Sequence, residues 1–266
     1  MMSHLRFVRQ AMAAGIAILA VGFTTAGARA DYENVYSAGH ADLNISYNSG
    51  AGALHLNYEF GTNAVINGVV LGAGGAGERE ANTITVLLAA NTLGVGAAGL
   101  PAPFAGNPLW VLPQTSQAGK PFLGIGAESI DPGLFQNDTL TLTLTGFSQR
   151  PAGGEFVLWQ NGSEATPFMN SANGLSSADH VDATAGAHDH FNWGFTQEGT
   201  YDLNFRATGT LTNGTLLTTN AIYRFQVGTQ AVPEPGTFAL ASVGIISLSL
   251  LTLARRARRS EPEASA

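Results

Sequence analysis

The sequence predicts an all-β protein, an antiparallel two-sheet sandwich of the jelly-roll or immunoglobulin-like kind. Segments between residues 42 and 228 alternate apolar and polar side chains with a period of two, which is typical of strands with one buried face. Glycine, proline, asparagine and serine separate these segments. No segment outside the two termini keeps a convincing helical period. Many short strands with turn residues between them favour a sandwich over an α/β fold.

The first two alternating segments predict a β-hairpin. Residues 42–47 and 53–60 each place apolar side chains on one face, and the polar and glycine residues of 48–52 interrupt the pattern between them. Two alternating segments joined by turn residues are typical of adjacent antiparallel strands. The side chains expected to point inward are Leu43, Ile45, Tyr47, Leu54, Leu56, Tyr58 and Phe60.

The rest of the domain predicts further strands and two long loops. Residues 93–124 and 167–187 lack a regular period, and we interpret both as loops across the sandwich. Loops of this length either carry contact surfaces or merely connect strands, and both alternatives stay open. Further strands are expected at residues 84–88, 138–145, 156–159, 200–208 and 221–228.

The N-terminal residues 1–30 are typical of a secretory signal peptide. Arg6 and Arg9 precede a short apolar segment, residues 11–23, and small residues follow it. This segment is too short to favour a retained membrane anchor. The residues that mark the cleavage site are Ala28, Ala30 and Asp31.

The C-terminal end predicts a membrane helix followed by a basic cluster. Residues 237–254 are uncharged, and about 18 helical residues cover ~27 Å, close to the hydrocarbon thickness of a bilayer. Arginines remain on the cytoplasmic side, so residues 260–266 are expected to form a cytoplasmic tail and the preceding domain to lie outside. The four arginines are Arg255, Arg256, Arg258 and Arg259.

A Pro-Glu-Pro motif precedes this helix, and the whole segment 232–259 resembles the PEP-CTERM sorting signal. The resemblance implies an exported protein that uses the secretion machinery and is recognised by an exosortase-type membrane enzyme of Gram-negative, exopolysaccharide-producing bacteria. A plain C-terminal membrane anchor is the alternative, and it predicts the same topology. The residues of the motif are Val232, Pro233, Glu234 and Pro235.

The exported part, residues 31–231, is acidic and lacks cysteine. Five basic residues stand against sixteen acidic ones, a net charge near −11. This charge disfavours nucleic acid, because a phosphate backbone requires clustered Lys and Arg. The absence of cysteine excludes disulfides, thiolate metal sites and thiol nucleophiles.

No motif supports an enzyme. The glycine-rich residues 72–77 match a dinucleotide pattern, but no βαβ alternation follows them. The scattered carboxylates show no spacing that selects an acid/base pair, and no Gly-x-Ser-x-Gly elbow is present. We therefore expect a protein that is not an enzyme, and an envelope or polysaccharide hydrolase is the least favoured alternative.

A histidine pair offers the one chemical signal of the domain. In an extended strand His188 and His190 share a face about 6.5 to 7 Å apart, and both imidazoles can reach one cation at ~2.0 to 2.1 Å. The missing ligands must come from elsewhere in the chain, where His40 with Asp42 and His180 with Asp182 form two His-x-Asp pairs. A zinc or manganese ion is the expected cofactor of such a site. Structural hydrogen bonding by the same side chains is the favoured interpretation, and metal binding is the alternative.

Several segments together resemble the choice-of-anchor M domain of bacterial surface proteins. They are residues 39–43, 122–126, 153–159 and 188–211, within a similarity that covers about residues 37–228. The resemblance implies a bacterial surface protein. We expect its domain to have a binding or structural role at the cell surface or in the extracellular matrix, with exopolysaccharide or other surface proteins as partners, and a metal-binding surface domain is the alternative. Related domains accompany metal-type transport systems, which by analogy favours metal at the histidines. Here the domain occurs once and has a different tail, so a transporter partnership is not carried over.

Overall fold

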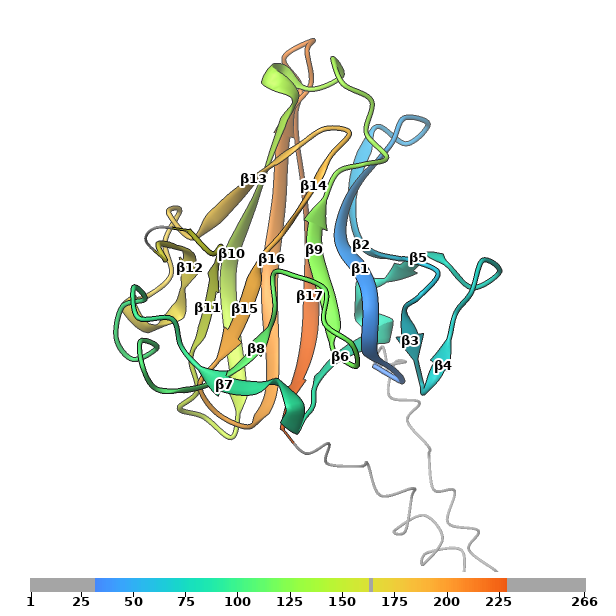
Figure 1. The fold of residues 1–266 in the computed structure, drawn as a ribbon. Coiled ribbons are helices and arrows are strands. Elements are labelled where there is room, and N and C mark those ends of the chain that lie inside the picture. The colour runs from blue at the N-terminus through green and yellow to red at the C-terminus, as the bar shows by residue number, and fades with distance from the viewer. Residues whose placement is uncertain (1–31, 163–164, 229–266) are drawn as a thin grey trace, which may run out of the picture. The chain divides into compact units, whose positions relative to one another are not determined.

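The computed structural model describes residues 32–162 and 165–228. Strands of these residues form a twelve-stranded and a five-stranded sheet (Figure 1), which confirms the predicted all-β, two-sheet architecture. The signal peptide 1–30 and the sorting segment 232–259 with its tail lie outside the described residues. Within the described part, no helix is long and apolar enough to cross a membrane. Its only helices are short 3-10 turns, Ala81–Thr83, Ala90–Thr92, Gln136–Asp138 and Ser171–Asn173.

The twelve-stranded sheet has eight strands in its main order, and the predicted hairpin lies near one end of that order. Four further strands lie beside the main order. Strand β9 (Pro121–Gly126) pairs with β1, and β14 (His188–His190) pairs with β9. Strands β3 (Val65–Ile66) and β4 (Val69–Val70) form a small hairpin that pairs with β1. Its main order is β13 (His180–Thr184), β10 (Thr139–Arg150), β16 (Gly199–Thr210), β17 (Leu216–Val227), β6 (Ile84–Leu88), β1 (Asn34–Asn48), β2 (Ala53–Phe60) and β5 (Gly77–Glu80).

The five-stranded sheet is built from shorter strands, and most of its central residues are buried. Its order is β12 (Pro167–Asn170), β11 (Phe156–Trp159), β15 (Asn192–Phe195), β8 (Pro108–Leu112) and β7 (Leu93–Val95).

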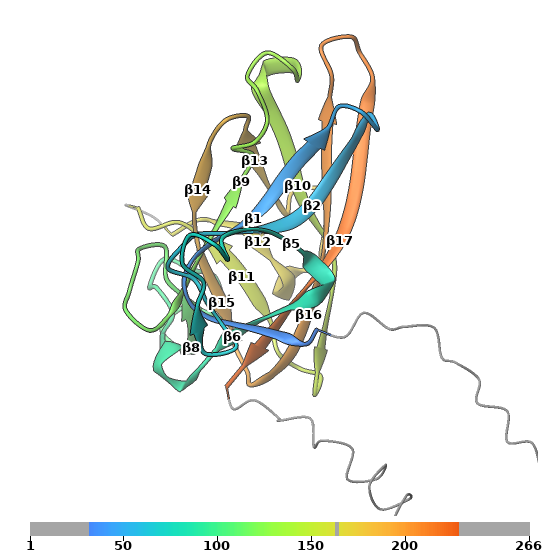
Figure 2. The same ribbon diagram turned by 90° about the vertical axis from the view of Figure 1, so that its right-hand side faces the viewer.

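Strand β1 joins two parts of the large sheet. Its first residues pair with β6, whereas residues 41–48 pair with β2 and residues 39–44 with β9. The change of partners occurs at Gly39, where φ is +83° and a β-carbon would lie 2.1 Å from the carbonyl oxygen of Asn63. Only glycine fits this bend. As a result, β14, β9, β1 and β2 are neighbouring strands (Figure 2).

The predicted hairpin is confirmed, and it packs on β17. Leu43 pairs with Tyr58 and Ile45 with Leu56, and all four side chains are buried as expected. The ring of Tyr58 meets that of Tyr223 edge-on at a centroid distance of 4.9 Å. The period of two therefore identified the core face of this hairpin correctly.

The expectation of a purely antiparallel sandwich is wrong. Strand β1 runs parallel to both β6 and β9, and β17 runs parallel to β6. Each of these pairs is separated by a long stretch of chain, which parallel pairing requires. The sheet is therefore mixed.

Aromatic side chains from the small sheet form the core against the large one. Trp193 stacks on Phe225 at a centroid distance of 5.5 Å, and Phe195 lies 5.2 Å from the same ring. The indole Nε1 of Trp193 donates a hydrogen bond of 3.0 Å to the carbonyl oxygen of Leu123 in β9. This bond links β15 to the strand on which the candidate site is built.

The two segments interpreted as loops contain strands. Residues 93–124 include β7, β8 and most of β9, and residues 167–187 include β12 and β13. Strand β8, which lies within the first of these segments, illustrates the reason. Its alternate side chains enter two apolar clusters, one on each face of the small sheet. A strand with both faces buried has no polar alternation to detect.

Candidate metal centre

Three adjacent strands position the site. Strand β9 lies between β1 and β14, and its Gly124 is the register partner of both Asp42 and His190. His40 lies two residues from Asp42 along β1, and His188 lies two residues from His190 along β14. Because side chains alternate along a strand, each pair shares a face.

The structure brings together the four residues singled out in the sequence. His40, Asp42, His188 and His190 each offer one ligand atom, and these atoms all lie within 4.8 Å of one another. The ring centroids of His40 and His190 are 5.2 Å apart, as are those of His188 and His190. Two pairs separated by about 150 residues thus form one cluster.

The other histidines of the domain lie elsewhere. His55 is exposed on β2. His180 is on β13, with Nδ1 2.9 Å from the carbonyl oxygen of Ser177, while Asp182 accepts a hydrogen bond from Thr141. Neither belongs to the cluster of four.

Glycine on the central strand makes room for the cluster. A β-carbon on Gly124 would lie 2.1 Å from Asp42 Oδ1 and 3.1 Å from His190 Cε1. A β-carbon on Gly126 would lie 3.0 Å from the Cβ of His188. Side chains of the two outer strands therefore lean over a central strand that has none at these positions.

Asp42 is buried without a hydrogen-bond partner. Its side chain is 3% exposed, and neither carboxylate oxygen accepts a hydrogen bond. His40 Nε2 lies 3.3 Å from Asp42 Oδ2, in a geometry that makes no hydrogen bond. The Nδ1 atom of His190 is also buried and unpartnered. Buried polar atoms of this kind are costly, and a bound cation is one explanation for them.

The surroundings shift the ionisation of the cluster. Burial raises the pKa of Asp42 to about 7 and lowers the pKa of His190 to about 4. Burial also lowers the pKa of His40. For His188, burial acts downward, but the hydrogen bond to Glu128 and the charge of Asp42 outweigh it and raise the pKa. His40 and His190 therefore favour the neutral form that binds metals.

An aromatic ring holds one of the imidazoles. Phe122 of β9 stacks on His190 with a centroid distance of 3.6 Å and an interplanar angle of 7°. The ring of His40 lies 5.5 Å from the same phenyl ring. Phe122 thus restricts the rotation of a side chain that faces the cluster.

Acidic side chains surround the cluster. Glu128 contacts His188, and Asn44 donates hydrogen bonds to both Glu59 and Glu78. Over residues 32–162 and 165–228, no lysine or arginine forms a salt bridge with these glutamates or with Asp42. Nothing in the sequence pattern marks Glu128, because this residue lies in an irregular loop after β9.

The segment that carries His188 and His190 divides into two strands at Phe191. Residues 188–190 belong to the large sheet and residues 192–195 to the small one. Asn192, two residues beyond His190, donates a hydrogen bond to Asn161 and accepts one from the backbone amide of Gln114. It plays a structural part and does not join the cluster.

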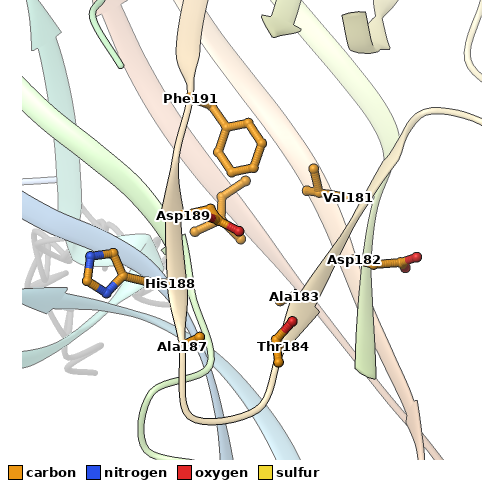
Figure 3. A pocket seen from close by; sticks show the side chains of 9 residues that line it. Val181, Asp182, Ala183, Thr184, Ala187, His188, Asp189 and Phe191 are labelled. Carbon is orange, nitrogen blue, oxygen red and sulfur yellow. The ribbon is translucent and has the colours of Figure 1, made fainter. Parts of the chain in front are cut away.

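A small cavity beside the cluster is lined in part by His188. It measures about 10 Å³, and its lining also includes Val181 of β13, Asp189 of β14 and Phe191, which lies between β14 and β15. Figure 3 shows that the ring of His188 points to the opposite side of β14 from Phe191. The cavity has room for about one water molecule, so it does not form a ligand site.

No family model matches the chain, and neither a curated protein nor a solved structure is detectably similar to it. Fold and site therefore define only a class: a two-sheet, all-β protein with three histidines and an aspartate grouped on a sheet face.

Proposed function

We propose that the exported domain, residues 31–231, binds a divalent transition metal ion, zinc or manganese, through His40, Asp42, His188 and His190. The observation that carries this proposal is the buried Asp42 carboxylate. It has no hydrogen-bond partner and lies among three imidazoles.

The dimensions of the cluster fit such an ion. Zinc binds histidine nitrogen and carboxylate oxygen at about 2.0 to 2.2 Å, so ligand atoms around a tetrahedral ion lie about 3.4 Å apart. The four ligand atoms now lie within 4.8 Å of one another, and small side-chain rotations close the remaining distance. A set of neutral imidazoles and one carboxylate suits zinc and manganese.

The charge around the site supports the same proposal. Asp42 lies beside His40, and Glu128 contacts His188. Neither carboxylate forms a salt bridge with an arginine or lysine of the described residues. A divalent cation offsets this negative charge and supplies the interaction that Asp42 lacks.

The cellular setting of the proposed site comes from the two ends of the chain. A signal peptide at 1–30 and a PEP-CTERM-like tail at 232–259 support an exported protein, sorted by an exosortase-type enzyme to the cell surface or extracellular matrix. The domain is then a jelly-roll or immunoglobulin-like sandwich resembling choice-of-anchor M domains. A structural or polymer-binding role without metal is the second candidate, and it is favoured by the sorting tail alone.

Calorimetric titration of the purified full-length chain in mild detergent tests the metal proposal. The unmodified chain is expected to bind about one equivalent of zinc or manganese at neutral pH. The double variant His188→Ala/His190→Ala is expected to bind none. His55→Ala, which removes an exposed histidine outside the cluster, is the matched control and retains binding. Absence of binding to the unmodified chain overturns the proposal.

A further inference from the structure

We propose that Glu128 is a positioning residue of this metal centre, which holds His188 so that its Nε2 atom faces the ion. The inference rests on the proposed metal function and deepens it. Glu128 was not among the residues that the sequence pattern singled out.

The contact between the two side chains assigns the proton. Glu128 Oε1 lies 2.7 Å from His188 Nδ1. An ionised carboxylate only accepts hydrogen bonds, so Nδ1 is the donor and carries a proton. In the neutral imidazole the lone pair is then on Nε2. A histidine ligand commonly gives its second ring N–H to a carboxylate in this way, which fixes the ring and strengthens its basicity.

The backbone places Glu128 at this position. Glu128 follows β9 by two residues, and β9 ends at Gly126, the register partner of His188. The adjacent Ala127 donates to the carbonyl oxygen of Ala187 and accepts from the amide of Gly186, both at 2.9 Å. These two bonds tie the loop after β9 to the turn before β14. The carboxylate is therefore held beside His188 by the fold.

A purely structural ion pair does not explain this arrangement well. The side chains of Glu128 and His188 are 46% and 32% exposed, and exposed ion pairs contribute little to stability. Removing Glu128 is therefore expected to leave the fold intact. Any large change in metal affinity then reports on the orientation of His188.

The experiment measures metal affinity and histidine tautomer in the full-length chain. Glu128→Ala is expected to weaken zinc binding about 10- to 100-fold. Glu128→Gln is expected to weaken it less, because the amide oxygen still accepts the Nδ1 hydrogen. Glu80→Ala is the control, since it removes an exposed carboxylate on β5 that does not contact His188, and its affinity is expected to stay close to that of the unmodified chain.

Two spectroscopic measurements separate positioning from other roles. Nitrogen-15 spectra of the metal-free chain are expected to show His188 protonated at Nδ1, and Glu128→Ala is expected to lose this preference. With cobalt as the probe, the absorption bands of Glu128→Ala are expected to keep their positions at saturation, because the four ligands are unchanged. Shifted bands mean that Glu128 is itself a ligand and overturn the inference.

The outcomes distinguish the inference from the function on which it rests. If the unmodified chain binds zinc and Glu128→Ala binds equally well, the positioning role is wrong and the metal site stands. If the unmodified chain binds no metal, the proposed function fails, and the positioning role fails with it whatever the tautomer of His188.

Discussion

Gly124 and Asp42 are register partners in the parallel pair of β9 and β1, and a β-carbon on Gly124 would lie 2.1 Å from Asp42 Oδ1. The carboxylate therefore occupies space that any other residue at position 124 would fill. This relationship links the packing of three strands to the proposed binding of a metal ion.

Gly124→Ala is expected to abolish metal binding while the chain still folds. The added methyl group displaces Asp42 and the ring of His190, and overpacking of this kind costs about 1 to 3 kcal/mol of unfolding free energy. Calorimetry with and without zinc measures both effects. The control is Gly74→Ala, an exposed position where a β-carbon meets no atom within 4 Å. A zinc-dependent rise in melting temperature that survives in Gly124→Ala contradicts the prediction.

Asp42→Asn is expected to stabilise the metal-free chain and to remove metal binding. The substitution replaces a buried carboxylate without hydrogen-bond partners by a neutral group of the same shape, which is expected to raise the unfolding free energy by about 1 to 3 kcal/mol. Denaturant unfolding in the presence of a chelator measures this change in unfolding free energy. The pH is 7.5, roughly one unit above the reference histidine pKa. A metal-free variant less stable than the unmodified chain means that Asp42 is structural.

Asp202 is expected to make the fold sensitive to acid. Its oxygens accept hydrogen bonds from Arg224 at 2.6 and 2.9 Å and from Arg150 at 2.8 Å. Burial acts to raise the pKa of Asp202, but these hydrogen bonds and charges outweigh it and lower the pKa below its ordinary value. The folded pKa is thus below the unfolded one, so the stabilisation is present above the unfolded pKa near ~3.9 and is lost as pH falls through the folded value.

The variant Asp202→Asn is therefore expected to lose about 1 to 2 kcal/mol of unfolding free energy at pH 7, and much less near the folded pKa of the carboxyl. Urea unfolding of the variant and the unmodified chain across this pH range measures the difference. Asp131→Asn, at an exposed position, is the control and is expected to change little. An equal loss from Asp202→Asn at every pH contradicts the linkage.

Processing of the two termini is expected to leave a mature protein that begins at Asp31 and lacks the arginine cluster. The small residues before Asp31 favour signal cleavage, and the PEP-CTERM-like tail favours removal by a sorting enzyme. Mass spectrometry of surface material tests both ends. Recovery of peptides that span Arg255 to Arg259 from the mature protein supports plain membrane anchoring instead.

Periodicity identified the β-hairpin of residues 42–60 and its core face, because side-chain alternation is a local property of each strand. It failed for β9, whose two glycines and buried neighbours leave no alternation. It also gives no sign of the break at Phe191, where the chain passes from one sheet to the other. A change of pairing partner leaves no mark on the local pattern of side chains.

The sequence by itself determined which residues have metal-binding chemistry, since His-x-His and His-x-Asp spacings place two ligands on one strand face. Only the tertiary structure decided that His40 and Asp42 meet His188 and His190 across β9, and that Glu128 contacts His188. Strand neighbours are selected by the burial of apolar surface over the whole domain, including the Trp193 core and the bend at Gly39. Such long-range packing cannot be deduced from the spacing of residues along one segment.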